Sequence, residues 1–146
     1  MRFVQLKHQI ETEGIIDKVL RAFTSGKSIS LDYYDVWEID GRKKYLEINI
    51  DGHKYKITRN PNFIFEEIRN KLDPVFFKMA KKALERTLGR SVSEDEIDYD
   101  SFGNQYIELN SCIYVAKGAE EETVETVGFL HKSYKLEPPK IIEYCD

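Results

Sequence analysis

The amino-acid sequence predicts a single α+β domain over residues 1–146, in which helices cover one face of an antiparallel sheet. Apolar residues alternate along several short segments that are joined by turn sequences, as in strands with one apolar and one polar face. Other segments repeat their apolar residues every three to four positions, which is typical of amphipathic helices. We therefore expect a two-layer sandwich, with a meander sheet of about five to six strands and two to three helices on its apolar face.

The N-terminal segment predicts a strand and then a helix. Apolar residues alternate over residues 2–10, which favours a strand. Thr12 is a suitable N-cap for the helix that follows, and Gly26 is a suitable residue to end it. Between them, apolar residues recur at helical spacing at Ile16, Val19, Leu20 and Phe23.

Residues 28–58 carry the clearest pattern, which is that of a three-stranded meander. Three alternating segments are separated by Asp40-Gly41 and Asp51-Gly52, and Asp-Gly is a strong signal for a two-residue hairpin loop. If each Asp-Gly pair forms the loop itself, Leu31 lies opposite Ile50 in the first hairpin. In the second hairpin Leu46 lies opposite Ile57, so that both registers place apolar residues on the same face.

Two consecutive helices are predicted next. Asn60-Pro61 begins the first, which carries the apolar residues Ile64, Phe65, Ile68 and Leu72. Asp73-Pro74 begins the second, with aspartate as N-cap and proline at the first helical position, and Gly89 ends it.

The C-terminal third is predicted to be mostly strand. Ser93 and Glu96 have the spacing of a capping box, which indicates one short helical turn. Residues 104–117 alternate as one strand. Residues 120–136 are compatible with a helix or a strand, and their threonines and valines favour a hairpin with the preceding strand. Pro138-Pro139 is expected to break that element and leave a short terminal strand over residues 140–144.

Composition limits the classes of protein to consider. A chain of 146 residues can bury roughly 70% of its unfolded surface, so it needs no disulfide to fold. With only two cysteines and no signal peptide or apolar span, we expect free thiols, a cytoplasmic location and no membrane contact. No glycine-rich phosphate loop or histidine pair at metal-ligand spacing occurs, so we expect no cofactor.

Charge is distributed unevenly along the chain. Residues 1–90 contain 18 Lys and Arg against 13 Asp and Glu, whereas residues 91–146 contain 4 against 13. Such asymmetry favours a charged partner surface, although neighbouring segments of opposite sign can also neutralise each other in the folded protein.

Two candidate sites would suit nucleic-acid chemistry. Asp32, Glu47 and Lys56 fall on the polar face of the meander, and two carboxylates beside a lysine could support metal-dependent phosphodiester cleavage. The stretch DVWEIDGRKKYLEIN resembles a nuclease core with Glu-x-Lys on its second strand, but Asn49 stands at the lysine position. Alternatively, the basic helix 74–90 could follow phosphates with a stripe of cations formed by Lys78, Lys82, Arg86 and Arg90.

A third candidate site would bind a protein. Tyr34 and Tyr45 both fall on the polar sheet face, and exposed tyrosines are enriched at contact surfaces. The acidic run Glu120, Glu121 and Glu122 could meet a basic patch on a partner. The favoured hypothesis is a non-enzymatic binding or regulatory domain, inhibitor-, immunity- or adaptor-like, with a protein partner.

Overall fold

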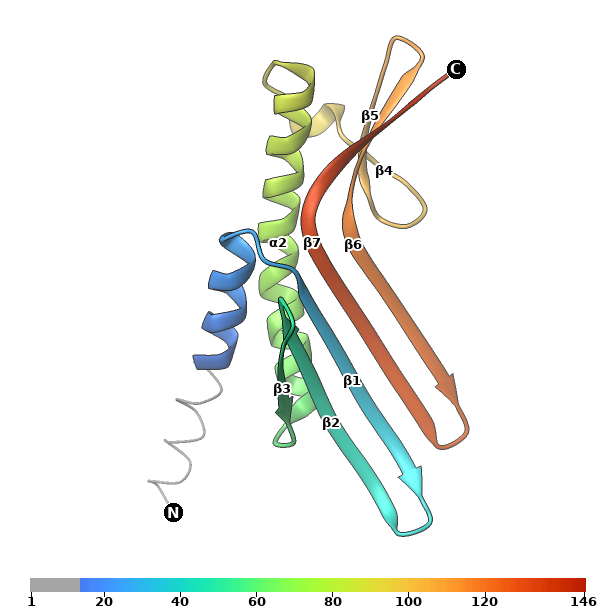
Figure 1. The fold of residues 1–146 in the computed structure, drawn as a ribbon. Helices are drawn as coiled ribbons and strands as arrows, with labels where there is room; N and C mark the ends of the chain where they lie inside the picture. The colour runs from blue at the N-terminus through green and yellow to red at the C-terminus, as the bar shows by residue number, and fades with distance from the viewer. Residues whose placement is uncertain (1–13) are drawn as a thin grey trace.

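The structure, a computed structural model, describes residues 14–146 and confirms the α+β class. The strand expected over residues 2–10 and the N-cap at Thr12 lie outside the described residues. Within them, seven strands form one antiparallel sheet in the order β3-β2-β1-β7-β6-β5-β4, more strands than expected (Figure 1). The labelled elements are β1 (Ile29–Glu38), β2 (Gly41–Ile50), β3 (His53–Ile57), α2 (Pro61–Leu88), η1 (Glu94–Glu96), β4 (Asp98–Tyr99), β5 (Gln105–Leu109), β6 (Cys112–Thr126) and β7 (Phe129–Cys145).

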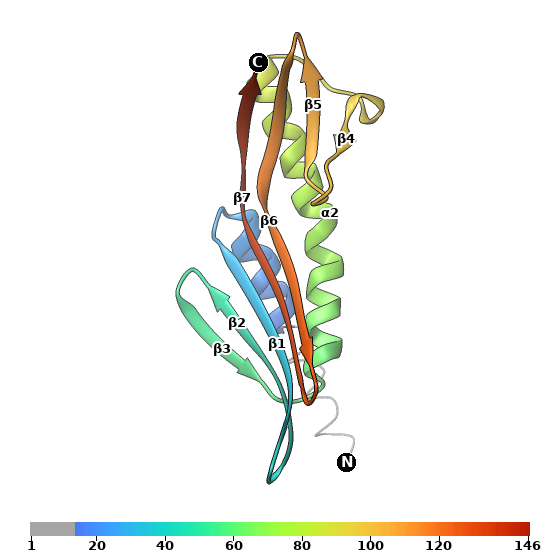
Figure 2. The same cartoon turned by 90° about the vertical axis from the view of Figure 1, so that its right-hand side faces the viewer.

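A helix over residues 14–24 and the longer helix α2 lie on the same side of the long strands (Figures 1 and 2). The core forms between these helices and the facing side of the sheet. Its largest fully buried side chains include Phe23, Phe65, Ile68, Leu72, Leu31, Ile48 and Leu136. The first helix ends as predicted at Gly26, whose φ of 95° is one that glycine adopts without strain.

The register of the first hairpin differs from the prediction by two residues. Leu31 lies opposite Ile48, not Ile50, because the loop consists of residues 39 and 40 and Gly41 already belongs to β2, opposite Glu38. A shift of two residues keeps every side chain on its predicted face. The second hairpin has the predicted register, with Asp51 and Gly52 at φ 50° and 94° in its loop.

The prediction of two helices after residue 60 is wrong, because α2 runs without interruption from Pro61 to Leu88 and contains Pro74. Asp73 does not cap a helix but accepts a hydrogen bond from the hydroxyl of Tyr134 in β7. A proline inside a helix costs about 3 kcal/mol. Burial of Leu72 and Phe76 on either side of it against the sheet offsets this cost and keeps the helix continuous. No helix among residues 14–146 is long and apolar enough to cross a membrane.

The strand predicted over residues 104–117 is two strands. β5 ends at Leu109 and β6 begins at Cys112, with Asn110 and Ser111 in the loop at φ 52° and 67°. Residues 120–136 are strand, not helix, as favoured, but the hairpin turn lies inside this segment. Residues 120–126 complete β6, and β7 begins at Phe129 after a turn at residues 127–128. The short turn predicted from Ser93 and Glu96 is also present, as η1.

Pro138-Pro139 does not end the last strand, contrary to the prediction. β7 continues to Cys145, and the two prolines fall in a bulge where its pairing with β6 passes from Leu136 to Lys140. Their missing N–H groups therefore interrupt no pair of the ladder. Gly118 lies opposite this bulge, where a Cβ atom would stand 2.6 Å from the carbonyl oxygen of Glu137. The absence of a side chain at Gly118 lets the backbone of β7 approach β6 this closely.

The expectation of free thiols is also wrong, because Cys112 and Cys145 form a disulfide. The register of β6 and β7 places the two residues directly opposite each other, with Cα atoms 4.2 Å apart. That is the close spacing of an antiparallel pair without hydrogen bonds, which suits a direct crosslink.

Candidate functional site

Three aromatic rings form a continuous stack on the sheet face opposite the helices. Tyr45, Tyr34 and His131 lie side by side in β2, β1 and β7, each directly opposite the next in the register. The ring centroids of Tyr34 and Tyr45 are 4.9 Å apart, and those of Tyr34 and His131 are 4.3 Å apart. Lys56 in β3 extends the stack, with its Nζ atom 4.6 Å from the centroid of Tyr45.

Asp32 fixes the imidazole at one end of this stack. The Nε2 atom of His131 lies 2.9 Å from Oδ1 of Asp32, and both side chains are about a quarter exposed, at 24% and 23%. The hydroxyl of Ser30 donates a hydrogen bond of 3.3 Å to the other carboxylate oxygen. The ring orientation of His131 is therefore set from β1, two residues away from Tyr34.

The environment of Tyr34 keeps its hydroxyl protonated. Burial is the largest cause that raises the pKa of Tyr34, and the negative charges of Asp32 and Glu47 raise it further. A neutral phenol can both donate and accept a hydrogen bond, and its ring presents apolar area with little conformational entropy to lose on binding.

Two of the three glutamates predicted for partner binding share this face. Glu122 lies opposite Ser133, which lies opposite Asp32, and Glu120 lies one pair further along the same face, opposite Lys135. Glu121 points to the helix side and forms an ion pair of 2.5 Å with Arg69 of α2. The structure thus brings Glu120 and Glu122 to the side of the tyrosines and engages Glu121 elsewhere.

A groove of about 890 Å³ lies next to the acidic pair. Glu120, Glu122 and Ser133 line it together with the apolar side chains of Phe102 and Ile142, both of which are exposed. The open sheet face therefore has a concave region beside the acidic pair.

The phosphodiesterase hypothesis concerns three residues that lie in one row across three strands, namely Asp32, Glu47 and Lys56. However, Asp32 is already bound to His131. Among residues 14–146, the only three ligand atoms of His, Cys, Asp or Glu within 4.8 Å of one another are those of Cys112, Glu143 and Cys145. The row does not form a compact metal cage in this conformation.

The basic stripe lies on α2, on the other side of the sheet from the tyrosines. Lys78, Lys82 and Arg86 are exposed, as the helical spacing predicts. Arg90, beyond the end of the helix, forms an ion pair of 2.9 Å with Glu96. The nucleic-acid and protein-binding hypotheses thus concern opposite faces and can be tested separately.

Sequence reasoning did not select His131, which completes the aromatic stack. Its contacts with Tyr34 and Asp32 join positions nearly 100 residues apart, and they depend on β7 pairing with β1. No local pattern indicates that pairing.

Comparison with known proteins adds no relative: no family model, curated protein or solved structure matches this chain.

Proposed function

We propose that this domain is a non-enzymatic binding or regulatory module, inhibitor-, immunity- or adaptor-like, that recognises a protein partner through its open sheet face. We call this surface the tyrosine face and define it by Tyr34, Tyr45, His131, Glu120 and Glu122. The observation that carries the proposal is the stack of three rings on a side of the sheet that no described helix covers.

Preorganisation makes the stack suitable as a binding anchor. Contact surfaces gain most of their affinity from a few rigid aromatic side chains, which lose little entropy on binding. Here the ring of Tyr34 is held between two others, and Asp32 holds the last ring in place. These contacts fix the orientation of the rings before any partner binds, which an isolated surface tyrosine lacks.

The charges around the stack indicate what the partner must complement. Asp32, Glu47 and Glu122 follow one row of the face, while Lys56 lies at its end and Lys135 faces Glu120. The face therefore carries mostly negative charge, with two lysines at fixed positions among the carboxylates. Such a pattern favours one partner with complementary charges over general attraction to a polyanion.

The test is a pull-down from the native host with tagged full-length protein, with and without nuclease treatment. We expect one stoichiometric protein that resists nuclease and is lost with the double variant Tyr34→Asp/Tyr45→Asp. The matched control is Tyr99→Asp, because Tyr99 is 58% exposed and lies in β4, which is separated from β1 by three strands in the sheet order. The partner should then be purified. Its affinity for the wild type, the double tyrosine variant and the Tyr99→Asp control should be measured by calorimetry.

Other results would support the two alternatives. If all retained material is nucleic acid and is lost with Lys82→Glu, the basic helix is the binding surface. If the purified protein cleaves phosphodiesters with a divalent metal and Glu47→Ala abolishes this activity, the protein is an enzyme. Retention of the partner by the double tyrosine variant would also overturn the proposal.

A further inference from the structure

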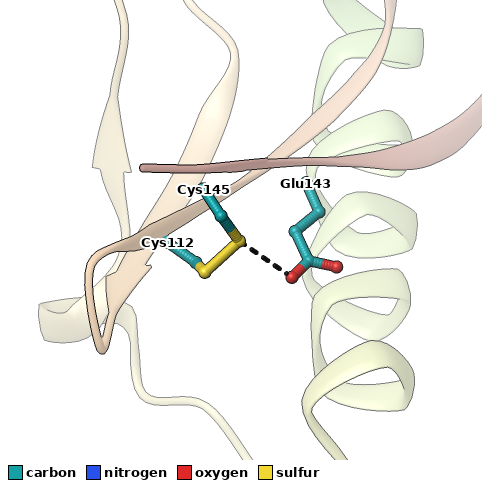
Figure 3. Close-up of side chains that lie close together, drawn as sticks. All are labelled: Cys112, Glu143 and Cys145. Carbon is teal, nitrogen blue, oxygen red and sulfur yellow. Dashed lines mark hydrogen bonds between the residues drawn. A yellow bond between two sulfur atoms is a disulfide. The ribbon is translucent and has the colours of Figure 1, made fainter.

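The two cysteines and Glu143 form a compact cluster at the end of the β6–β7 ladder (Figure 3). Cys112 begins β6, Cys145 ends β7, and Glu143 lies two residues before Cys145, so that both β7 side chains project from the same face. The Oε1 atom of Glu143 lies 3.1 Å from the sulfur of Cys145. Glu143 and Cys145 are exposed and Cys112 is partly exposed, so ions and reductants can reach the cluster.

In the oxidised state, the contact between the Glu143 carboxylate and the Cys145 sulfur has no hydrogen atom to bridge it. A disulfide sulfur carries no hydrogen, so it cannot donate a hydrogen bond to Glu143. The hydroxyl of Tyr114 donates to the same oxygen, but over 3.4 Å. A positive group between sulfur and oxygen, either a thiol proton or a metal ion, would satisfy the geometry better than the disulfide does.

We propose that the reduced protein binds a thiophilic divalent cation of the zinc class through Cys112, Cys145 and Glu143, with water as fourth ligand. Zinc accepts thiolate and carboxylate ligands together, in tetrahedral geometry. Its bond lengths of about 2.3 Å to sulfur and 2.0–2.2 Å to oxygen separate ligand atoms by about 3.5–3.8 Å. The three ligand atoms already lie within 4.8 Å of one another, so small side-chain rotations bring them to that spacing.

Oxidation state would then control occupancy of the site. A dithiol reductant transfers two electrons and two protons to the disulfide, leaving two cysteine thiols and becoming a disulfide itself. Binding of the cation displaces the proton from each thiol and forms two metal–sulfur bonds. The reverse exchange with a small-molecule disulfide takes two electrons from the thiolates and two protons from solvent, which turns that oxidant into two thiols and re-forms the Cys112–Cys145 bond. The cation is then released, because a disulfide sulfur is a poor ligand.

The experiment uses full-length protein reduced with a phosphine, since dithiol reductants themselves bind zinc. The reduced and oxidised proteins are titrated without oxygen with Zn²⁺ by calorimetry and with Cd²⁺ by the ultraviolet thiolate-to-metal absorption band. We expect equimolar binding to the reduced protein and none to the oxidised protein. Binding should release protons, so its heat should depend on the ionisation enthalpy of the buffer.

Three variants assign the ligands. Cys145→Ser should abolish binding, and Glu143→Gln should weaken it about tenfold or more, a loss of roughly 1.4 kcal/mol. Glu137→Gln is the matched control, because it neutralises an exposed carboxylate of the same strand outside the cluster. The proposal is overturned if reduced protein binds no cation, if Cys145→Ser still binds it, or if Glu143→Gln binds as tightly as Glu137→Gln.

Discussion

The ring of Tyr34 stacks on that of His131, with centroids 4.3 Å apart and planes within 3° of parallel. The two residues lie in strands β1 and β7, which are adjacent in the sheet although distant in the chain. Because Asp32 binds the imidazole from β1, a change at any of these three positions alters the same surface. The aromatic stack is thus one unit built from both halves of the chain.

Tyr34→Ala should weaken binding of the proposed protein partner by about 2 kcal/mol or more, as expected for a central aromatic anchor. The loss of the ring removes contact area and leaves Tyr45 and His131 without their shared neighbour. Calorimetry with the purified partner measures this change. Lys82→Glu, on the other side of the sheet, serves as control and should leave the affinity unchanged. A larger loss with Lys82→Glu than with Tyr34→Ala would place the binding surface on α2.

Gly118→Ala should destabilise the fold by about 1–3 kcal/mol, the usual cost of overpacking. The added Cβ would lie 2.6 Å from the carbonyl oxygen of Glu137 and 3.0 Å from the ring of Phe76. Gly14→Ala is the matched control, because no atom of residues 14–146 lies within 4 Å of its Cβ position and alanine favours a helix. Urea unfolding of both variants tests the expectation. Equal stability of the two would mean that the β6–β7 bulge adjusts without cost.

Pro74→Ala should stabilise the protein by up to about 3 kcal/mol, because it restores the N–H group that helix α2 lacks at this position. The proline side chain is exposed, so its removal leaves no cavity. Thermal and urea unfolding provide the measurement. Pro61→Ala is the comparison, since proline is well tolerated at the first position of a helix and that substitution should bring no such gain. If Pro74→Ala lowers the free energy of unfolding instead, the proline stabilises the conformation of α2 that packs on the sheet.

The parts of the fold that the sequence predicts correctly depend on local signals. Alternation and the two Asp-Gly pairs identify the meander, because strand period and turn conformation involve neighbouring residues only. The loop at Asn110 and Ser111 has no glycine to mark it in the sequence, although both residues adopt positive φ. The helix start predicted at Pro74 is wrong because the local preference of proline for a first helical position is weaker here than the burial of residues on both sides of it.

The candidate site is less predictable than the fold. Tyr34 and Tyr45 could be assigned to the polar face, since face depends only on alternation. Their direct stacking, the addition of His131 and the crosslink between Cys112 and Cys145 depend on register and strand order instead. Those properties arise from long-range packing, for which a single sequence gives few constraints.

Tyr134→Phe should lower the free energy of unfolding by about 1–3 kcal/mol at neutral pH. Tyr134 is 3% exposed, and its hydroxyl donates to the carboxylate of Asp73 in the middle of α2. The phenylalanine leaves this partly buried carboxylate without that donor. The connection between β7 and the helix would then depend on apolar contacts alone.

This destabilisation should depend on pH in the alkaline range. Burial, followed by the hydrogen bond to Asp73, raises the pKa of Tyr134 above its ordinary value. The folded protein therefore holds the phenol proton more tightly than the unfolded chain, in which tyrosine titrates near about pH 10. The stabilising contribution is complete below that pH and declines as the pH rises towards the pKa of the folded state. The stability difference between wild type and Tyr134→Phe should accordingly shrink above about pH 10.

Urea unfolding of wild type and Tyr134→Phe, at a series of pH values from neutral to alkaline, measures this linkage. Tyr99→Phe is the control, because it removes a phenol hydroxyl from a largely exposed ring and should show no comparable convergence with wild type. A difference between wild type and Tyr134→Phe that stays constant across the series would mean that the proton of Tyr134 is held no more tightly in the folded protein than in the unfolded chain. The bond to Asp73 would then contribute the same stability at every pH, and the predicted linkage would be wrong.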